Sequence, residues 1–98
     1  MNTAFLLMAQ YNGQAVIPLD TVCRDYFAPL TEENLRKKVT SGEIKIPLVR
    51  MSDKSQKSAR GIHLQDLANF IDERRSEALK ESAQLHAQKI GGTRGGTR

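Results

Sequence analysis

The sequence lacks the features that mark secreted, membrane-spanning and disulfide-bonded proteins. Its 98 residues include one cysteine, Cys23, which cannot form an internal disulfide, and no signal-peptide pattern opens the chain. The longest apolar run, residues 4–9, is far shorter than the roughly 18 residues that span a bilayer. We therefore expect a cytoplasmic protein that makes no contact with a membrane.

Motifs for catalysis and metal binding are also missing. There is no GxSxG, no phosphate loop ahead of a helix and no carboxylate pair among apolar residues. Cys23, His63 and His86 show neither CxxC nor HxxxH spacing, so we expect no zinc site. Cys23 instead belongs to an apolar stripe, where a small core residue is expected. The sequence predicts no enzyme, no metal and no cofactor.

What the chain does contain is basic charge, and most of it lies in the middle. The net charge is +4, and residues 31–60 alone carry eight basic and four acidic residues. A localised basic surface favours a polyanion partner. The alternative is a merely solvated surface, because a net charge of this size is moderate for a small domain. The choice between them depends on the elements that carry the charge.

The first 27 residues predict two helices. Residues 3–11 are rich in helix-favouring types, and Asn12-Gly13 follows at the place of a left-handed helix cap. The alternative takes Asn12-Gly13 as a hairpin turn between strands 5–11 and 15–19. A second helix opens at Pro18, and its apolar positions form one stripe: Leu19, Val22, Cys23, Tyr26 and Phe27.

A third helix is expected over about residues 31–41. Pro29 cannot continue the preceding helix, and the Thr31 hydroxyl can accept a hydrogen bond from the free amides of the next one. Gly42 is suited to close that helix. The connection, residues 28–30, is so short that the two helices form a predicted helix-turn-helix.

A basic hairpin and a last helix complete the predicted fold. Ile44, Ile46 and Leu48 alternate as in a strand, residues 52–60 form a basic loop, and residues 62–64 resemble a return strand or helix entry. An amphipathic helix then starts near Leu64, with a weak coiled-coil seam at Leu79, Ala83, His86 and Ile90. The fold class is therefore mainly α with a small β-hairpin, a winged helix-turn-helix. We divide the chain into a domain at 1–75, a helix extension at 76–90 and a disordered basic tail at 91–98.

The helix at 31–41 predicts a DNA-reading surface. If Leu35 and Val39 face the core, the opposite face consists of groups that read base edges or contact phosphates in the grooves of a duplex. The basic loop can contact phosphates or the minor groove. The candidate DNA-binding residues are Asn34, Arg36, Lys37, Lys38, Thr40 and Ser41 of the helix, and Lys54, Gln56, Lys57 and Arg60 of the loop.

Several segments resemble one family. FLLMAQYNG, VIPLDTVCRDYF, GEIKIPLVRM and HLQDLANFIDERR, with SQK at residues 55–57, are similar to the pyocin activator protein family over about residues 5–75. The resemblance implies a bacterial transcription activator of bacteriocin (pyocin) genes, with promoter DNA as partner and a location at the nucleoid. More loosely, the order of elements resembles phage excisionases and the DNA-binding heads of MerR-like regulators.

Two other functions stay open on the sequence alone. An excisionase-like architectural factor would bend DNA without activating transcription, and an adaptor would dock its long helix on a protein such as RNA polymerase. RNA polymerase is also a candidate partner of the activator. A homodimer is favoured because one small module covers few base pairs and regulators often use paired half-sites.

Overall fold

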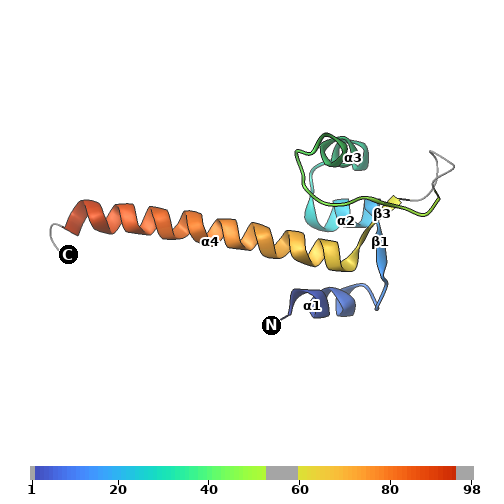
Figure 1. Ribbon diagram of the computed structural model, residues 1–98, viewed down its shortest axis with the longest axis horizontal. Helices are drawn as coiled ribbons and strands as arrows, with labels where there is room; N and C mark the ends of the chain where they lie inside the picture. Colours follow the sequence, from blue (N-terminus) through green and yellow to red (C-terminus); the bar gives the residue numbers. More distant parts are fainter. Residues whose placement is uncertain (1, 53–59, 95–98) are drawn as a thin grey trace.

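The computed structural model describes residues 2–52 and 60–94, and these form a mainly helical fold with a small antiparallel sheet (Figure 1). The arrangement is compatible with the expected winged helix-turn-helix. In chain order the elements are α1 (Thr3–Gln10), β1 (Val16–Pro18), α2 (Leu19–Tyr26), α3 (Glu32–Ser41), β2 (Val49–Arg50), β3 (Arg60–His63) and α4 (Leu64–Arg94).

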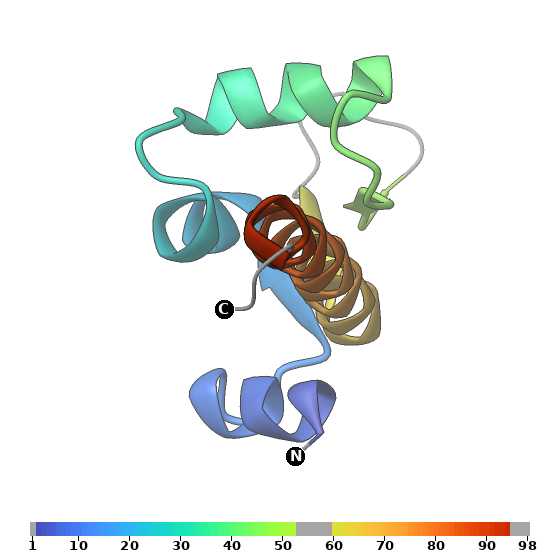
Figure 2. The same cartoon turned by 90° about the vertical axis from the view of Figure 1, so that its left-hand side faces the viewer.

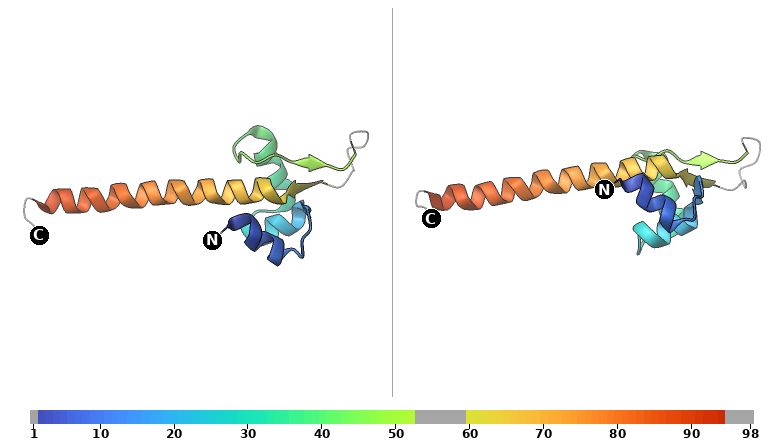
Figure 3. Two further views of the ribbon diagram at one scale, coloured as in Figure 1. Left: turned by 60° about the horizontal axis from the view of Figure 1, so that its bottom comes forward. Right: turned by 90° about the horizontal axis from the view of Figure 1, so that it is seen from below.

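The molecule is a small head with one long helix leaving it. The principal extents are 64 × 29 × 20 Å, and α4 accounts for the long dimension (Figure 1). Viewed along α4, α3 and α1 lie on opposite sides of the head, with α2 and β1 between them (Figure 2). We call residues 2–52 and 60–72 the head, and residues 73–94 of α4 the rod. Figure 3 shows that the rod projects from the head, and its first residues line a groove with residues 43–45 of the head.

The end of the rod is helical where a disordered tail was predicted. Helix α4 continues to Arg94, so the first four residues of the segment 91–98 are helical, whereas a disordered tail was expected from residue 91. Once a helix exists, each added residue gains a hydrogen bond without a new nucleation cost, and this can carry it through two glycines. Residues 95–98 lie outside the described part. Among the described helices none is long and apolar enough to cross a membrane.

The first segment is helical, and the alternative hairpin for residues 5–19 is wrong. Asn2 caps α1 by accepting a hydrogen bond from the Phe5 amide at 3.2 Å. The chain then reverses through Asn12 and Gly13, which have φ angles of 55° and 75°. A strand does follow at β1, but it pairs with β3 and not with residues 5–11. Pro18, expected to open α2, ends β1 and stands at the N-cap of α2.

The sheet has the order β1-β3-β2, so the return strand of the hairpin is its centre. Both pairings are antiparallel, with Ile17 opposite Ile62 and Arg50 opposite Arg60. The strand expected over residues 44–48 is wrong, because the strand begins at Val49. Pro47 has no amide proton to donate, and the Ile44 amide bonds back to the Lys38 carbonyl at 3.0 Å. The predicted alternation of buried and exposed side chains is still present, because Ile46 is buried and Lys45 is exposed.

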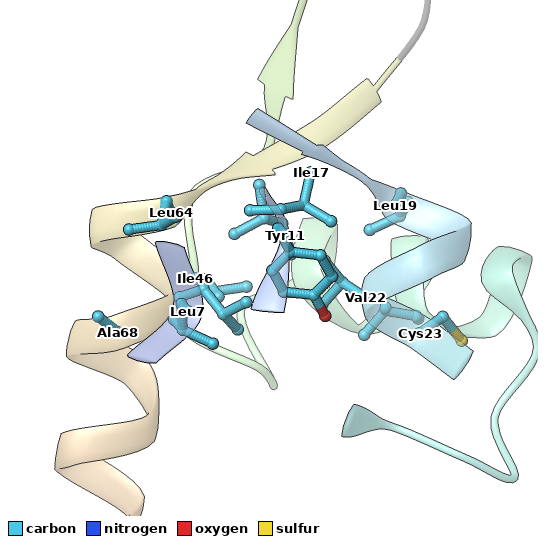
Figure 4. Packing of buried hydrophobic residues seen from close by; sticks show 12 residues of the cluster. Leu7, Tyr11, Ile17, Leu19, Val22, Cys23, Ile46, Leu64 and Ala68 are labelled. Carbon is cyan, nitrogen blue, oxygen red and sulfur yellow. The ribbon is translucent and has the colours of Figure 1, made fainter. Parts of the chain in front are cut away.

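One apolar core joins every helix to the sheet (Figure 4). Its fully buried centre consists of Ile17, Leu19, Val22, Leu35, Ile62 and Leu67. Leu7 and Leu35 join this core from α1 and α3, which lie on opposite sides of the head (Figure 2). Phe27 and Phe70 pack beside it with ring centroids 5.6 Å apart. Helices α2 and α3 and strand β3 of the hairpin therefore pack on one core.

Candidate nucleic-acid interface

Helix α3 is defined by local chemistry at both ends. The Thr31 hydroxyl accepts a hydrogen bond from the Asn34 amide at 3.2 Å, as predicted, and Glu32 and Glu33 occupy the first turn, where the helix dipole favours acids. At the other end Gly42 adopts a φ of 87°. The helix therefore begins and ends within one residue of its predicted bounds.

The burial of α3 decides which side chains reach the solvent. Leu35 is 0% exposed, and Val39 packs against the same core. The positions on the opposite face of the helix are exposed, as predicted for a helix with Leu35 and Val39 in the core: Asn34, Lys37, Thr40 and Ser41. Arg36 and Lys38 lie on the two flanks and are half-buried. The six helix residues of the candidate surface thus lie on the solvent side and its margins.

Several of these side chains already have partners within the chain. The Lys37 ammonium lies 3.4 Å from the Glu33 carboxylate, and the Lys38 ammonium lies 2.8 Å from Glu43. The Ser41 hydroxyl donates to the Lys38 carbonyl at 3.1 Å. Lys38 and Ser41 therefore help to close the end of α3. Exposed pairs of this kind are weak, so a phosphate could replace the carboxylate beside either lysine.

The hairpin is adjacent to the beginning of α3. A shallow groove is lined by Glu32, Glu33 and Arg36 of α3 together with Arg60 of β3. Arg36 and Arg60, both predicted to bind DNA, therefore line the same groove although they belong to different elements. Two carboxylates line it with them. The remaining predicted loop residues, Lys54, Gln56 and Lys57, lie outside the described residues.

Arg50 belongs to the same basic region, although the sequence-based candidates omit it. It is exposed on β2 and pairs in register with Arg60 across the hairpin. Its position at the end of an apolar segment was visible in the sequence. Arg50 was not predicted as a candidate because the strand was expected at residues 44–48, so Arg50 was assigned to neither the strand nor the basic loop.

The remaining singled-out residues have structural roles. Cys23 is buried, its thiol donates to the Leu30 carbonyl at 3.0 Å, and burial raises its pKa, so it is an unreactive core residue as expected. His63 helps to start α4, because its Nδ1 accepts from the Gln65 amide at 3.0 Å. Among the described residues no three His, Cys, Asp or Glu side chains are grouped so that they could hold a metal ion.

The two tyrosines connect α1 and its turn to α2. The Tyr11 hydroxyl donates to Asp25 at 2.7 Å, and the Tyr26 hydroxyl donates to Gln10 at 2.7 Å. Burial and the carboxylate raise the pKa of Tyr11, and its hydrogen bond lowers the pKa of Asp25. Tyr11 is buried and Tyr26 is half-exposed on the α1 side, so neither is a base-stacking platform on α3.

Comparison with known protein families gives a match. The model of the family described as Pyocin activator protein PrtN matches residues 3–78, which is more than half of the chain. No curated protein and no solved structure matches the chain. The match covers the head and the first turns of the rod.

Proposed function

Because the chain belongs to the pyocin activator family, we propose that it activates pyocin genes by binding promoter DNA in a sequence-specific manner. In this proposal α3 enters the major groove, and the β2–β3 hairpin lies on the backbone or in the neighbouring minor groove. The partner is double-stranded DNA, with RNA polymerase as the further partner that activation requires. The chain would act as a regulator at the nucleoid.

The outward face of α3 is the observation that carries this proposal. Asn34 and Lys37 are exposed because Leu35 and Val39 hold the opposite side of the helix in the core. Asparagine can make two hydrogen bonds to adenine, and lysine or arginine can donate to guanine or to phosphate. A helix with this composition on its free side is suited to read base edges.

The hairpin supports the proposal through its arginines. Arg50 and Arg60 occupy facing positions on β2 and β3, and Arg60 shares a groove with Arg36 of α3. A guanidinium fork suits phosphate oxygens, so these residues would orient the protein on the duplex. Helix and hairpin would then contact adjacent parts of one site.

Protection footprinting on a pyocin promoter, combined with gel retardation, tests the proposal. We expect a protected site and retardation that survives an excess of random duplex. Arg36→Ala should weaken retardation, whereas Arg74→Ala, which removes the same charge from α4, should leave it unchanged. Retardation that random duplex removes completely would contradict sequence-specific binding.

A reporter gene placed behind the protected site separates activation from DNA bending. An activator raises expression, and an Arg36→Ala variant should lose that effect together with DNA binding. Unchanged expression with an intact footprint would instead indicate an excisionase-like architectural factor. A chain that shows neither footprint nor retardation would be an adaptor.

A further inference from the structure

Helix α1 is apolar on more than the side it buries. Only Leu7 is fully buried, whereas Phe5, Leu6 and Met8 are 68%, 49% and 47% exposed. A helix that is hydrophobic all round normally lies between two packed surfaces. The head supplies one of those surfaces. The other side of α1 lacks a cover from the described part of this chain.

Helix α4 carries a second uncovered surface, a line of residues on one face in which Leu79 and Ala83 are apolar. Residues 72–87 are all exposed, and Asp72, Ser76, Leu79, Ala83 and His86 follow each other at alternating steps of four and three along one face. This is the spacing of the residues that two paired helices bury between them. Leu79 is the large apolar residue of this line, with 53% of its surface exposed.

The exposed side of α1 and this line on α4 meet. The Thr3 hydroxyl, in the first turn of α1, donates to the Asp72 carboxylate at 2.6 Å. Asp72, the last residue of the head, is the first residue of this line, so α1 begins beside the line, on the same side of α4. Helix α3 lies on the opposite side of the head from α1 (Figures 1 and 2). A partner seated on α1 and the rod would therefore leave α3 free.

We propose that this combined surface binds a second copy of the chain, with the two rods antiparallel and each α1 against the partner's rod. A two-fold axis makes such a surface complementary to itself, since each copy supplies one α1 and one rod. The proposal does not depend on DNA binding.

Charge on the rod selects the antiparallel arrangement. In a parallel pair Arg75 of each copy would lie beside Lys80 of the other, which places two pairs of like charges at the interface. In an antiparallel pair with Ser76 opposite the partner's Leu79, Glu73 lies opposite the partner's Lys80 on both sides. Lys80 is 3.8 Å from Glu77 within its own chain, an exposed contact that is weak enough to exchange.

The size of the surface explains why α1 takes part. The line from Asp72 to His86 is about 21 Å long, and a helix is about 10–12 Å wide, so its footprint is roughly 250 Å². A specific interface buries about 800 Å² per partner. The rod alone is too small, and the exposed side of α1 supplies further apolar area at the place where the line begins.

Light scattering and sedimentation equilibrium on the full chain without DNA test the proposal. We expect a dimer, and we expect Leu79→Glu to raise its dissociation constant at least about tenfold, because the charge would be buried in the interface. The matched control is Leu85→Glu. Leu85 is 65% exposed on the same helix but lies about 120° around it from Leu79, so the constant should change less than about twofold.

Two further variants test α1 and the orientation. Phe5→Glu should also raise the dissociation constant about tenfold if α1 lies in the interface. Lys80→Glu should weaken the dimer roughly fivefold and the double variant Glu73→Lys/Lys80→Glu should restore it, since the axis repeats the pair. All these side chains are exposed, and circular dichroism checks that the helices persist.

The outcomes are distinct. A monomer at every concentration would overturn the proposal, as would equal effects of Leu79→Glu and Leu85→Glu. An unchanged dimer for Phe5→Glu would remove α1 from the interface and overturn the combined surface. A tighter dimer for Lys80→Glu would indicate parallel rods, because that change removes the repulsion from Arg75, and would overturn the proposed orientation.

Discussion

Leu35 is the residue that orients the candidate interface. It is fully buried, and its position on α3 turns Asn34 and Lys37 to the solvent. The Asn34 side chain is exposed, while its backbone amide is the group that Thr31 caps. A change of the Asn34 side chain should therefore leave the fold intact and affect recognition alone.

Asn34→Ala tests the base-reading role. We expect the variant to lose roughly 1–3 kcal/mol of binding free energy on the promoter site and to discriminate less between bases at one position of that site. Its affinity for random duplex should not change. Quantitative gel retardation with single-base variants of the site measures both effects. Asn69→Ala on α4 is the matched control, and equal losses on specific and random DNA would refute a base contact by Asn34.

Tyr11 and Asp25 make stability depend on pH. The hydrogen bond from Tyr11 lowers the pKa of Asp25 below its ordinary value of 3.8, so the folded state favours the carboxylate more than the unfolded chain does. This contribution is fully present above about pH 5 and is lost as pH falls through the lowered pKa. Burial raises the pKa of Tyr11 above its ordinary 10.0, so the folded state keeps a proton that the unfolded chain releases in alkali.

Tyr11→Phe should therefore be less stable than the wild type at neutral pH, by a margin that shrinks below pH 3.8 and again above pH 10.0. Chemical unfolding across this range measures the difference. Tyr26→Phe is the control, because the Tyr26 hydroxyl donates to the uncharged Gln10. The difference in stability between this variant and the wild type should stay constant in acid. A constant margin for Tyr11→Phe in acid would show that the hydrogen bond to Asp25 does not couple folding to protonation.

At the scale of elements, the helices follow local rules and the strands do not. The end of α3 at Gly42 depends on a left-handed backbone conformation that glycine adopts easily. The strand β3, in contrast, is central because it pairs with both β1 and β2, and β1 approaches it closely at Gly61. A Cβ on Gly61 would lie 2.6 Å from the Ile17 carbonyl oxygen and 2.7 Å from a methyl carbon of Val16.

Two glycine substitutions should therefore have different costs. Gly42→Ala meets open space and should cost about 1 kcal/mol for its backbone conformation. Gly61→Ala forces β1 and β3 apart and should cost more, up to roughly 3 kcal/mol. Thermal and urea unfolding compare the two variants directly, and a smaller loss for Gly61→Ala would contradict the close pairing of β1 with β3.

At the scale of the whole molecule, the basic helix α3 and the apolar helix α1 lie on opposite sides of the head. The cations of α3 and the hairpin lie away from α1 and its exposed Phe5, Leu6 and Met8 (Figure 2). This separation lets one side bind a polyanion while the other binds a protein. It also means that salt should act on the two associations differently.

The affinity for DNA should fall steeply with salt. If about five to eight phosphates are neutralised per protomer, log affinity falls against log salt with a slope of roughly −0.9 per contact. Arg50→Ala should reduce the magnitude of the slope by about one, and Arg74→Ala should not change it. Fluorescence anisotropy over a salt series measures the slope. A shallow slope that Arg50→Ala leaves unchanged would place the hairpin away from the DNA backbone.

The helices and their exposed faces could be predicted because each depends on residues close together in the sequence. Helix α3 begins after Thr31 and ends before Gly42, and each of these residues makes a hydrogen bond to a residue three positions away. The spacing of Leu35 and Val39 determines which face of the helix is buried. The strand prediction was wrong because Pro47 and the hydrogen bond from Ile44 to Lys38 remove the segment from the ladder. The DNA contacts stay a prediction at every candidate residue.

The sequence alone determined the helical segments, the basic middle third and the likeness to the pyocin activators, since these depend on composition and short-range spacing. Only the tertiary structure decided that β1 pairs with β3, that Tyr11 bonds to Asp25, and that Arg36 and Arg60 share a groove. These partners are distant along the chain, and they meet because one core of buried side chains brings their elements together.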